Sequence, residues 1–325
     1  MFRLSSVLLF SALACTAPKP AVVVSRVESA GTAKEASTPR GRALARAASQ
    51  LQPQPWWAEY ARRCGPLGGD PRLWQVEKPP LDGWNPPDRY PRCEWKVDVD
   101  AGVVTAAPSL PREEPALPFV PLEQPTLHIV RCEGEANEPR EPDAPLKVRD
   151  YLSTPTGFLV GYNSGEFGGE LWWFDREGNL EQIIARENVI RILKTADGIL
   201  AFAGIAHLTL DRGSVLKLTP RTHGWDATQT DLPGAPDAVL ALPDGAIFVV
   251  TTEHLVRIDA GAHVTVLHHG RWGGSYANSL VQDRDGSFYV GIRYFVVRLR
   301  PDTTGFREEW LVPSGTQVLG EDEPG

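Results

Sequence analysis

Residues 243–250 read PDGAIFVV, a turn that ends in glycine and runs directly into apolar and β-branched residues. This pattern predicts a tight turn followed by a β-strand. The same turn-and-strand pattern recurs at Gly157, Gly198 and Gly286, so that the four turn glycines are spaced by 41, 47 and 41 residues. The chain therefore contains a structural repeat.

Each apolar run is followed by a second strand-like run. The paired runs are 158–160 with 171–174, 199–201 with 214–218, 246–250 with 255–258, and 287–290 with 295–299. A period of this length with several strands per unit is typical of β-propeller blades. We predict an all-β, β-propeller-like repeat array over residues 146–325, with four visible blades. Strand-like runs at 95–99 and 126–130 would add a blade or a closing strand, which favours five or more blades.

The stretch from Leu146 to Pro313 resembles the NHL-type and the senescence-marker/gluconolactonase-type propellers. The resemblance rests on the repeated x-Asp-Gly turn, the apolar strand after it and a following Val-x-Arg-Ile-Asp-like strand. These motifs imply a style of fold and do not specify an activity.

The repeat places one residue of each blade near the mouth of a central channel. The residue eight positions before each turn glycine is expected at the start of the innermost strand, and these residues are Arg149, Ile190, Asp237 and Asn278. In gluconolactonase-like propellers, channel carboxylates and Asn side chains bind a divalent metal that polarises a lactone or ester carbonyl. The resemblance implies Asp237 and Asn278 as metal ligands with Glu166 as a third, and Ca²⁺ is one candidate because it prefers oxygen ligands.

Two of the four channel positions depart from that pattern. Arg149 would oppose a cation and Ile190 supplies no ligand. The alternative is that Asp237 and Asn278 cap turns while Arg149 pairs with Asp237. In a further alternative, the Arg binds a small anion or a peptide carboxylate.

Two loops place an aromatic residue before paired glycines, with Phe167 before Gly168-Gly169 and Trp272 before Gly273-Gly274. We expect these rings to contact a sugar or peptide on the loop face; the alternative is that they pack beneath the glycines. His207 has apolar neighbours on both sides and is expected to be a core histidine.

The N-terminus carries an export signal. Residues 1–14 combine Arg3, a short apolar run and Ala12-Leu13-Ala14, which is typical of a secretory signal peptide. With Cys15 the segment resembles a bacterial lipobox, which implies acyl chains on Cys15, a membrane anchor and a location facing the periplasm or in the outer membrane. Cleavage before Cys15 without acylation would instead give a secreted soluble protein.

Residues 15–50 are rich in Ala, Ser, Thr, Pro and Arg and are expected to form a disordered tether. Residues 51–145 are rich in Trp and Pro, which predicts an irregular segment that completes a blade in one interpretation. Three cysteines follow Cys15, and the preferred disulfide is Cys64 with Cys93; Cys132 could pair with either instead.

The net charge of the whole chain is −8, and residues 16–50 are locally basic. Nucleic-acid-binding proteins usually present a basic face, so we expect no nucleic-acid partner. The sequence lacks the usual hydrolase and nucleotide-binding motifs. The leading hypothesis is a non-catalytic envelope binding or scaffolding lipoprotein without a cofactor, whose loop face holds a protein or glycan. The alternatives are a metal-dependent lactonase or esterase and a purely structural lipoprotein.

Overall fold

The computed structural model describes residues 55–79, 92–109, 114–123, 125 and 146–313. Strands predominate within these ranges, and the α-helix among them is α2 (Pro55–Cys64). None of the described helices is long and apolar enough to cross a membrane. The predicted all-β class is confirmed. Cys15, Cys132 and the strand-like run at 126–130 lie outside the described residues.

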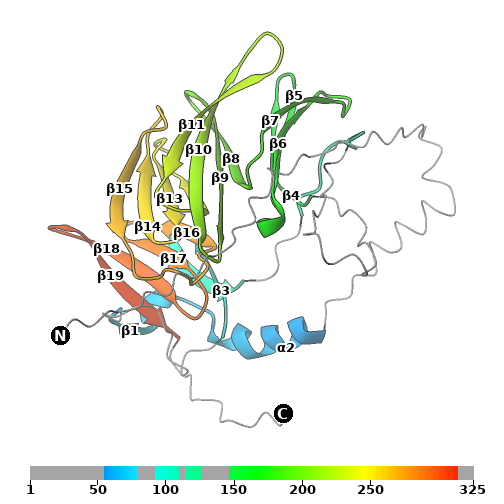
Figure 1. Ribbon diagram of the computed structural model, residues 1–325. Coiled ribbons are helices and arrows are strands. Elements are labelled where there is room, and N and C mark those ends of the chain that lie inside the picture. Colours follow the sequence, from blue (N-terminus) through cyan, green and yellow to red (C-terminus); the bar gives the residue numbers. More distant parts are fainter. Residues whose placement is uncertain (1–54, 80–91, 110–113, 124, 126–145, 314–325) are drawn as a thin grey trace, which may run out of the picture.

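Four antiparallel units follow one another along the chain (Figure 1). The first contains β4 (Val148–Thr154), β5 (Gly157–Tyr162), β6 (Leu171–Phe174) and β7 (Leu180–Ala185); the second β8 (Val189–Thr195), β9 (Gly198–His207), β10 (Leu210–Pro220) and β11 (Trp225–Leu232); the third β12 (Pro236–Ala241), β13 (Ile247–Thr251), β14 (His254–Ile258) and β15 (Val264–His269); the fourth β16 (Ser279–Gln282), β17 (Phe288–Gly291), β18 (Val296–Asp302) and β19 (Gly305–Val312). The first strands β4, β8, β12 and β16 lie beside one another in that order. The predicted propeller-like arrangement is therefore present.

The predicted turn glycines join the first and second strands of each unit. Gly245 and Gly286 have φ angles of 89° and 83°, a left-handed conformation in which a side chain is strained. The repeated glycine is thus a backbone requirement of the turn between the two innermost strands.

The core lies between the units. Along β9, Ile199 and Ala201 pack with residues of the first unit, whereas Leu200 and Phe202 pack with residues of the third. Successive side chains of a strand point to opposite faces, so both faces of this sheet are buried. Burial of each large side chain contributes about 1.5–3 kcal/mol, and the units are stabilised by stacking on their neighbours.

Residues before the repeat extend the array beyond the fourth unit. β1 (Gln75–Glu77) adds a strand to its outer edge, beside β19. β2 (Trp95–Asp100) and β3 (Val103–Pro108) form a hairpin, in which Val97 N donates to Ser279 Oγ at 2.9 Å. β2 lies beside β16, as each first strand lies beside the one before it.

At the opposite end of the array, residues 114–123, here named the covering segment, pack on the outer face of the first unit. Phe119 stacks on Phe158 with 4.5 Å between ring centroids, and Leu122 N donates to Gly178 O at 3.0 Å. Pro108 and Glu114 are six positions apart in the sequence and can lie at most roughly 20 Å from each other, so the two ends of the array are close to each other. The described residues give four units and a hairpin in the position of a fifth; five or more blades stays a prediction.

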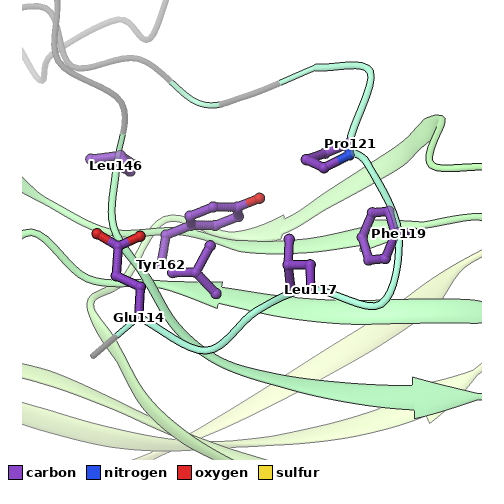
Figure 2. A pocket seen from close by; sticks show the side chains of 7 residues that line it. Glu114, Leu117, Phe119, Pro121, Leu146 and Tyr162 are labelled. Atoms are coloured by element: carbon purple, nitrogen blue, oxygen red, sulfur yellow. The ribbon is translucent and has the colours of Figure 1, made fainter. Parts of the chain in front are cut away.

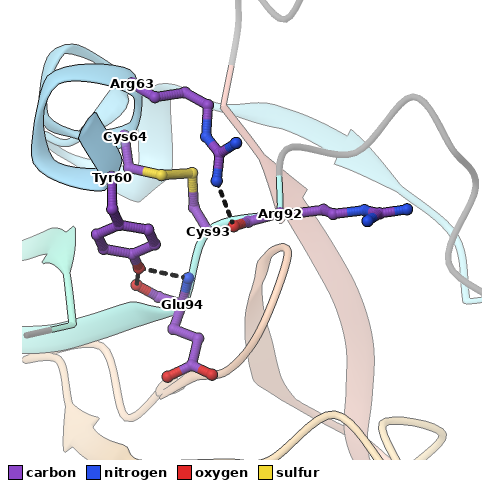
Figure 3. Close-up of a disulfide and its surroundings, with 6 residues drawn as sticks. All are labelled: Tyr60, Arg63, Cys64, Arg92, Cys93 and Glu94. Atoms are coloured by element: carbon purple, nitrogen blue, oxygen red, sulfur yellow. Dashed lines mark hydrogen bonds between the residues drawn. A yellow bond between two sulfur atoms is a disulfide. The ribbon is translucent and has the colours of Figure 1, made fainter. Parts of the chain in front are cut away.

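The predicted disulfide between Cys64 and Cys93 is present and joins α2 to the residues before β2 (Figure 3). Both cysteines are fully buried, and Tyr60 Oη donates to Glu94 O at 3.1 Å beside them. The helix α2 was not expected within the irregular segment. It is followed by two single-turn 3₁₀ helices, η2 (Gly65–Leu67) and η3 (Pro71–Leu73).

The Trp- and Pro-rich segment contains Trp56, Trp57, Trp74 and Trp84, and such large rings are expected to cover an apolar surface of the main domain. Trp74 is buried and lies edge-on to Trp95, with 4.9 Å between the ring centroids. The positions of the other three side chains are not among those described.

Candidate functional site

The connections of the four units fall into two groups at opposite ends of the strands. One group, here named the loop end, lies where β4, β8, β12 and β16 begin. It comprises residues 163–170, 186–188, 208–209, 233–235, 252–253, 270–278 and 292–295. The other group, the turn end, contains the glycine turns and the turns between the two outer strands.

The residues predicted at the channel mouth do start the innermost strands. The pairing of the first two strands shifts register around Arg149, Ile190 and Asp237, each the extra residue of a β-bulge. Asn278 directly precedes β16, and its N–H donates to Gly291 O at 2.9 Å. The eight-residue offset therefore reflects an equivalent position in all four units.

Among these four equivalent residues, Asp237 is the acid, and its pKa is strongly shifted. Burial raises its pKa to about 7; the nearby charge of Asp211 acts in the same direction, and Arg149 opposes it. Asp211 is itself held by the N–H of Ala235 at 2.7 Å and by Thr252 Oγ1 at 2.9 Å. The positive charge of Arg149 therefore acts on Asp237, and a direct pairing of the two side chains stays a prediction.

Asn278 has its amide oxygen engaged within the protein. Ser279 Oγ donates to Asn278 Oδ1 at 2.8 Å, and the same Ser279 Oγ accepts the N–H of Val97. The Asn278 amide nitrogen is buried without a hydrogen-bond partner among the described residues. Asn278 therefore supports the attachment of β2, and its position as a metal ligand stays a proposal.

Glu166, the expected third ligand, pairs with a histidine instead. It lies in the 3₁₀ helix η4 (Gly165–Phe167), and its Oε2 is 2.7 Å from His207 Nε2. Among the described residues, no group of three or more His, Cys, Asp and Glu side chains is arranged to hold a metal.

The expectation that His207 belongs to the core is wrong, because its side chain is 45% exposed. β9 and β10 continue beyond the neighbouring strands as a hairpin, so the apolar residues before His207 do not mark a buried position.

The two aromatic–Gly-Gly loops differ. Phe167 is 54% exposed, as expected for a contact residue. Trp272 is 1% exposed and belongs to the core between the third and fourth units, so its expected role in loop-face contacts is wrong. The ring packs directly over Gly270, where a Cβ would collide with it, and its Nε1 donates to Thr251 O at 3.4 Å.

Sequence reasoning missed two exposed apolar residues of the loop end, Leu208 and Tyr276, and a third, Leu210, at the start of β10 beside it. Leu208 is 93% exposed, Tyr276 is 60% exposed and Leu210 is 45% exposed. Leu208 and Tyr276 have φ angles of 52° and 53°. The local sequence does not predict this conformation at Leu208 and Tyr276, because left-handed positions usually carry Gly, Asn or Asp.

No family model matches the chain, and no curated protein matches it. Among solved structures, similar arrangements occur in a streptogramin B lyase (13% identity, TM-score 0.32, 50% of this chain and 53% of that one) and in virginiamycin B lyase from Staphylococcus aureus (12%, 0.35, 52% and 57%). A third is the extracellular domain of BT4673 from B. thetaiotaomicron (12%, 0.35, 74% and 30%). The chain spans about half the length of the two lyases. At this similarity the comparisons do not bear on activity or partners.

Proposed function

We propose that this chain is a non-catalytic binding protein of the bacterial envelope, anchored through Cys15, whose loop end holds a protein or glycan partner. The supporting observation is an asymmetry between the two ends of the strands. Phe167, Leu208 and Tyr276 are exposed apolar residues within the loop-end connections of the four units, whereas the described turn-end connections of these units contain no exposed large apolar residue of their own. The exposed Val120 and Leu122 beside the Gly178 turn belong to the covering segment. All three lie on connections at the same end of the strands, and exposed apolar patches often mark binding surfaces.

The backbone at two of these residues adds to the argument. An L-residue in the left-handed region costs roughly 1–2 kcal/mol, and Gly, Asn or Asp would cost less. Leu208 and Tyr276 occupy that region with bulky side chains. Strain retained at exposed positions is a feature of functional sites, and here it presents two apolar side chains to solvent.

Tyr276 also belongs to a mixed polar and aromatic surface. The Arg293 guanidinium lies over its ring at 4.5 Å from the centroid, and Arg293 pairs with Glu94 at 2.8 Å. An aromatic ring flanked by hydrogen-bonding groups suits the apolar face and hydroxyls of a sugar, and equally a peptide. The surface is thus compatible with both partner classes.

Two assays test the binding function. The purified chain is sedimented with isolated peptidoglycan, and immobilised chain captures proteins from an envelope extract of the source organism. We expect Phe167→Ser and Tyr276→Ser to reduce recovery at least about fivefold, which corresponds to about 1 kcal/mol. Val266→Ser is the matched control, because Val266 is a 51% exposed residue of the outer strand β15. Equal recovery with all three variants would contradict the proposal.

The lipid anchor has its own test. Wild-type chain expressed in a bacterial host should incorporate labelled palmitate and fractionate with membranes, whereas Cys15→Ala should do neither. A Cys15→Ala chain that remains membrane-bound would contradict anchoring through this residue.

A metal-dependent hydrolase is the second candidate, favoured by the raised pKa of Asp237 beside the Asp211 carboxylate. Two close carboxylates can attract a divalent cation. This candidate predicts about one Ca²⁺ or other divalent ion per purified chain, lost in Asp237→Ala. A metal-free protein whose melting temperature does not change with added divalent ions contradicts it.

A further inference from the structure

Two histidines lie side by side at the loop end of the third unit. His254 begins β14, His269 ends β15, and the two residues are partners across these strands. Gly270 N donates to Glu253 O at 2.7 Å, so the next pair, His254 with His269, exchanges no backbone hydrogen bonds. In such pairs the Cβ atoms are closest, about 4.5 Å apart. The two imidazole rings stack, with 4.7 Å between their centroids and 26° between their planes.

The nitrogen atoms of the two rings differ in what surrounds them. Nδ1 of His254 is buried and has no hydrogen-bond partner among the described residues. Nε2 of His269 lies 3.5 Å from Glu253 Oε2. Histidine metal ligands commonly bind the metal through one nitrogen and direct the other toward a carboxylate or a backbone carbonyl. The pair therefore offers one buried nitrogen without a partner and one ring that is oriented by an acid.

The charges around the pair favour a metal cation. Burial lowers the pKa of His254, and the neighbouring His269 acts in the same direction. A neutral imidazole is the form that binds a metal. Glu253 and Asp211 both act on His254 as negative charges, and they attract a cation. The Glu253 carboxylate lies against the loop that follows β15, since a Cβ at Gly273 would be 2.6 Å from Glu253 Oε1.

A pocket of about 270 Å³ lies elsewhere, between the covering segment and the first unit (Figure 2). Its lining is mostly apolar and includes Leu117, Phe119 and Tyr162, with Glu114 as the charged residue. None of its lining residues is a histidine. A metal that prefers imidazole ligands therefore has no reason to bind in this pocket.

We propose that His254 and His269 form a binding site for a divalent transition-metal ion, with Cu²⁺ bound most tightly. One nitrogen of each ring coordinates the metal, at about 2.0–2.1 Å, and waters complete the coordination. The His269 side chain is 68% exposed, so its ring can rotate from the stacked position toward the metal. Imidazole suits Cu²⁺, Ni²⁺ and Zn²⁺, and Cu²⁺ heads their order of affinity. The site depends neither on a loop-end partner nor on Asp237.

Titration of the metal ion alone into the purified full chain, prepared without a polyhistidine tag, tests the proposal. We expect about one Cu²⁺ per chain with a Kd of roughly 10 µM or below, as for two of the four ligands of a structural zinc site. The EPR spectrum of the bound Cu²⁺ should show coupling to imidazole nitrogen. Zn²⁺ should bind more weakly, and Ca²⁺, which prefers oxygen ligands, should not compete. Absence of Cu²⁺ binding, or its displacement by Ca²⁺, overturns the proposal.

Single substitutions assign the ligands. His254→Asn and His269→Asn should each weaken Cu²⁺ binding by about a hundredfold, because the second ligand no longer binds within the same molecule. Glu253→Gln should weaken binding by about tenfold, through loss of the acid that orients His269. His263→Asn is the matched control, because His263 pairs with a carboxylate, Asp259, at 3.0 Å in the turn between β14 and β15.

Melting temperatures measured without metal check that each variant is folded. The side chain of His269 is exposed, so His269→Asn decides the assignment even where His254→Asn is unstable. Wild-type Cu²⁺ affinity in His269→Asn, or an equal loss of affinity in His263→Asn, overturns the assignment to this pair.

Discussion

His207 Nε2 lies 2.7 Å from Glu166 Oε2 and joins the hairpin tip of the second unit to the η4 loop of the first. The two side chains are 45% and 44% exposed. Exposed ion pairs contribute only about 0–1 kcal/mol to stability. This contact therefore contributes little to the stability of the fold. Its main effect is to fix the position of one loop-end connection relative to the other.

The first prediction concerns this pair. Glu166→Gln should leave the unfolding free energy within about 1 kcal/mol of wild type, while amide hydrogen exchange at residues 207–210 becomes faster. The expected cause is release of the hairpin tip from η4. Unchanged exchange at the tip would mean that the hairpin is ordered without this contact.

The second prediction separates strain from binding at Leu208. Leu208→Gly removes a side chain from a left-handed residue and should increase the unfolding free energy by about 1 kcal/mol. It also removes a 93% exposed apolar group and should weaken partner recovery. Thermal melts and capture assays on the same preparation measure both. A variant that gains stability and keeps its partner would show that Leu208 does not contact it.

The third prediction follows from the raised pKa of Asp237. In the folded chain this group keeps its proton until about pH 7, whereas an unfolded chain releases it near pH 4. Its contribution to stability is therefore fully present below about pH 4 and is lost as the pH rises through 7. Asp237→Asn cannot ionise and should gain stability relative to wild type, by roughly 4 kcal/mol, between pH 4 and pH 8. Urea unfolding at the two pH values measures it, and a pH-independent difference would contradict the assignment.

The fourth prediction concerns the disulfide. Replacing Cys64 and Cys93 together with Ala should lower the unfolding free energy by roughly 3–4 kcal/mol, because the bond closes a loop of 29 residues. Cys132→Ala is the control and should have no comparable effect. A large loss with Cys132→Ala would instead support one of the pairings that the sequence left open.

The repeat could be predicted from the sequence because it depends on local features of the turns and strands. Gly245 and Gly286 are needed for the turn conformation, and the apolar runs after them are buried on both faces. The equivalence of Arg149, Asp237 and Asn278 followed from the same spacing. Cys64 and Cys93 were predicted because they bracket a segment with little regular structure.

The remaining features depend on long-range packing that no local pattern specifies. Trp272 is buried because the chain folds the ring over Gly270, whereas Phe167, in a similar motif, is exposed. His207 is exposed because β9 and β10 are longer than their neighbours. The covering segment was not predicted, since its contact between Phe119 and Phe158 joins residues far apart in sequence.

Site-specific photo-crosslinking in the source organism tests the loop-end binding surface most directly. A photoreactive amino acid replaces Phe167 at the loop end in one strain and Asp244 at the turn end in another. We expect a discrete crosslinked protein or glycan adduct from position 167 and none from position 244. Adducts from position 244 alone, or equally from both positions, would contradict the claim that the loop end is the binding surface.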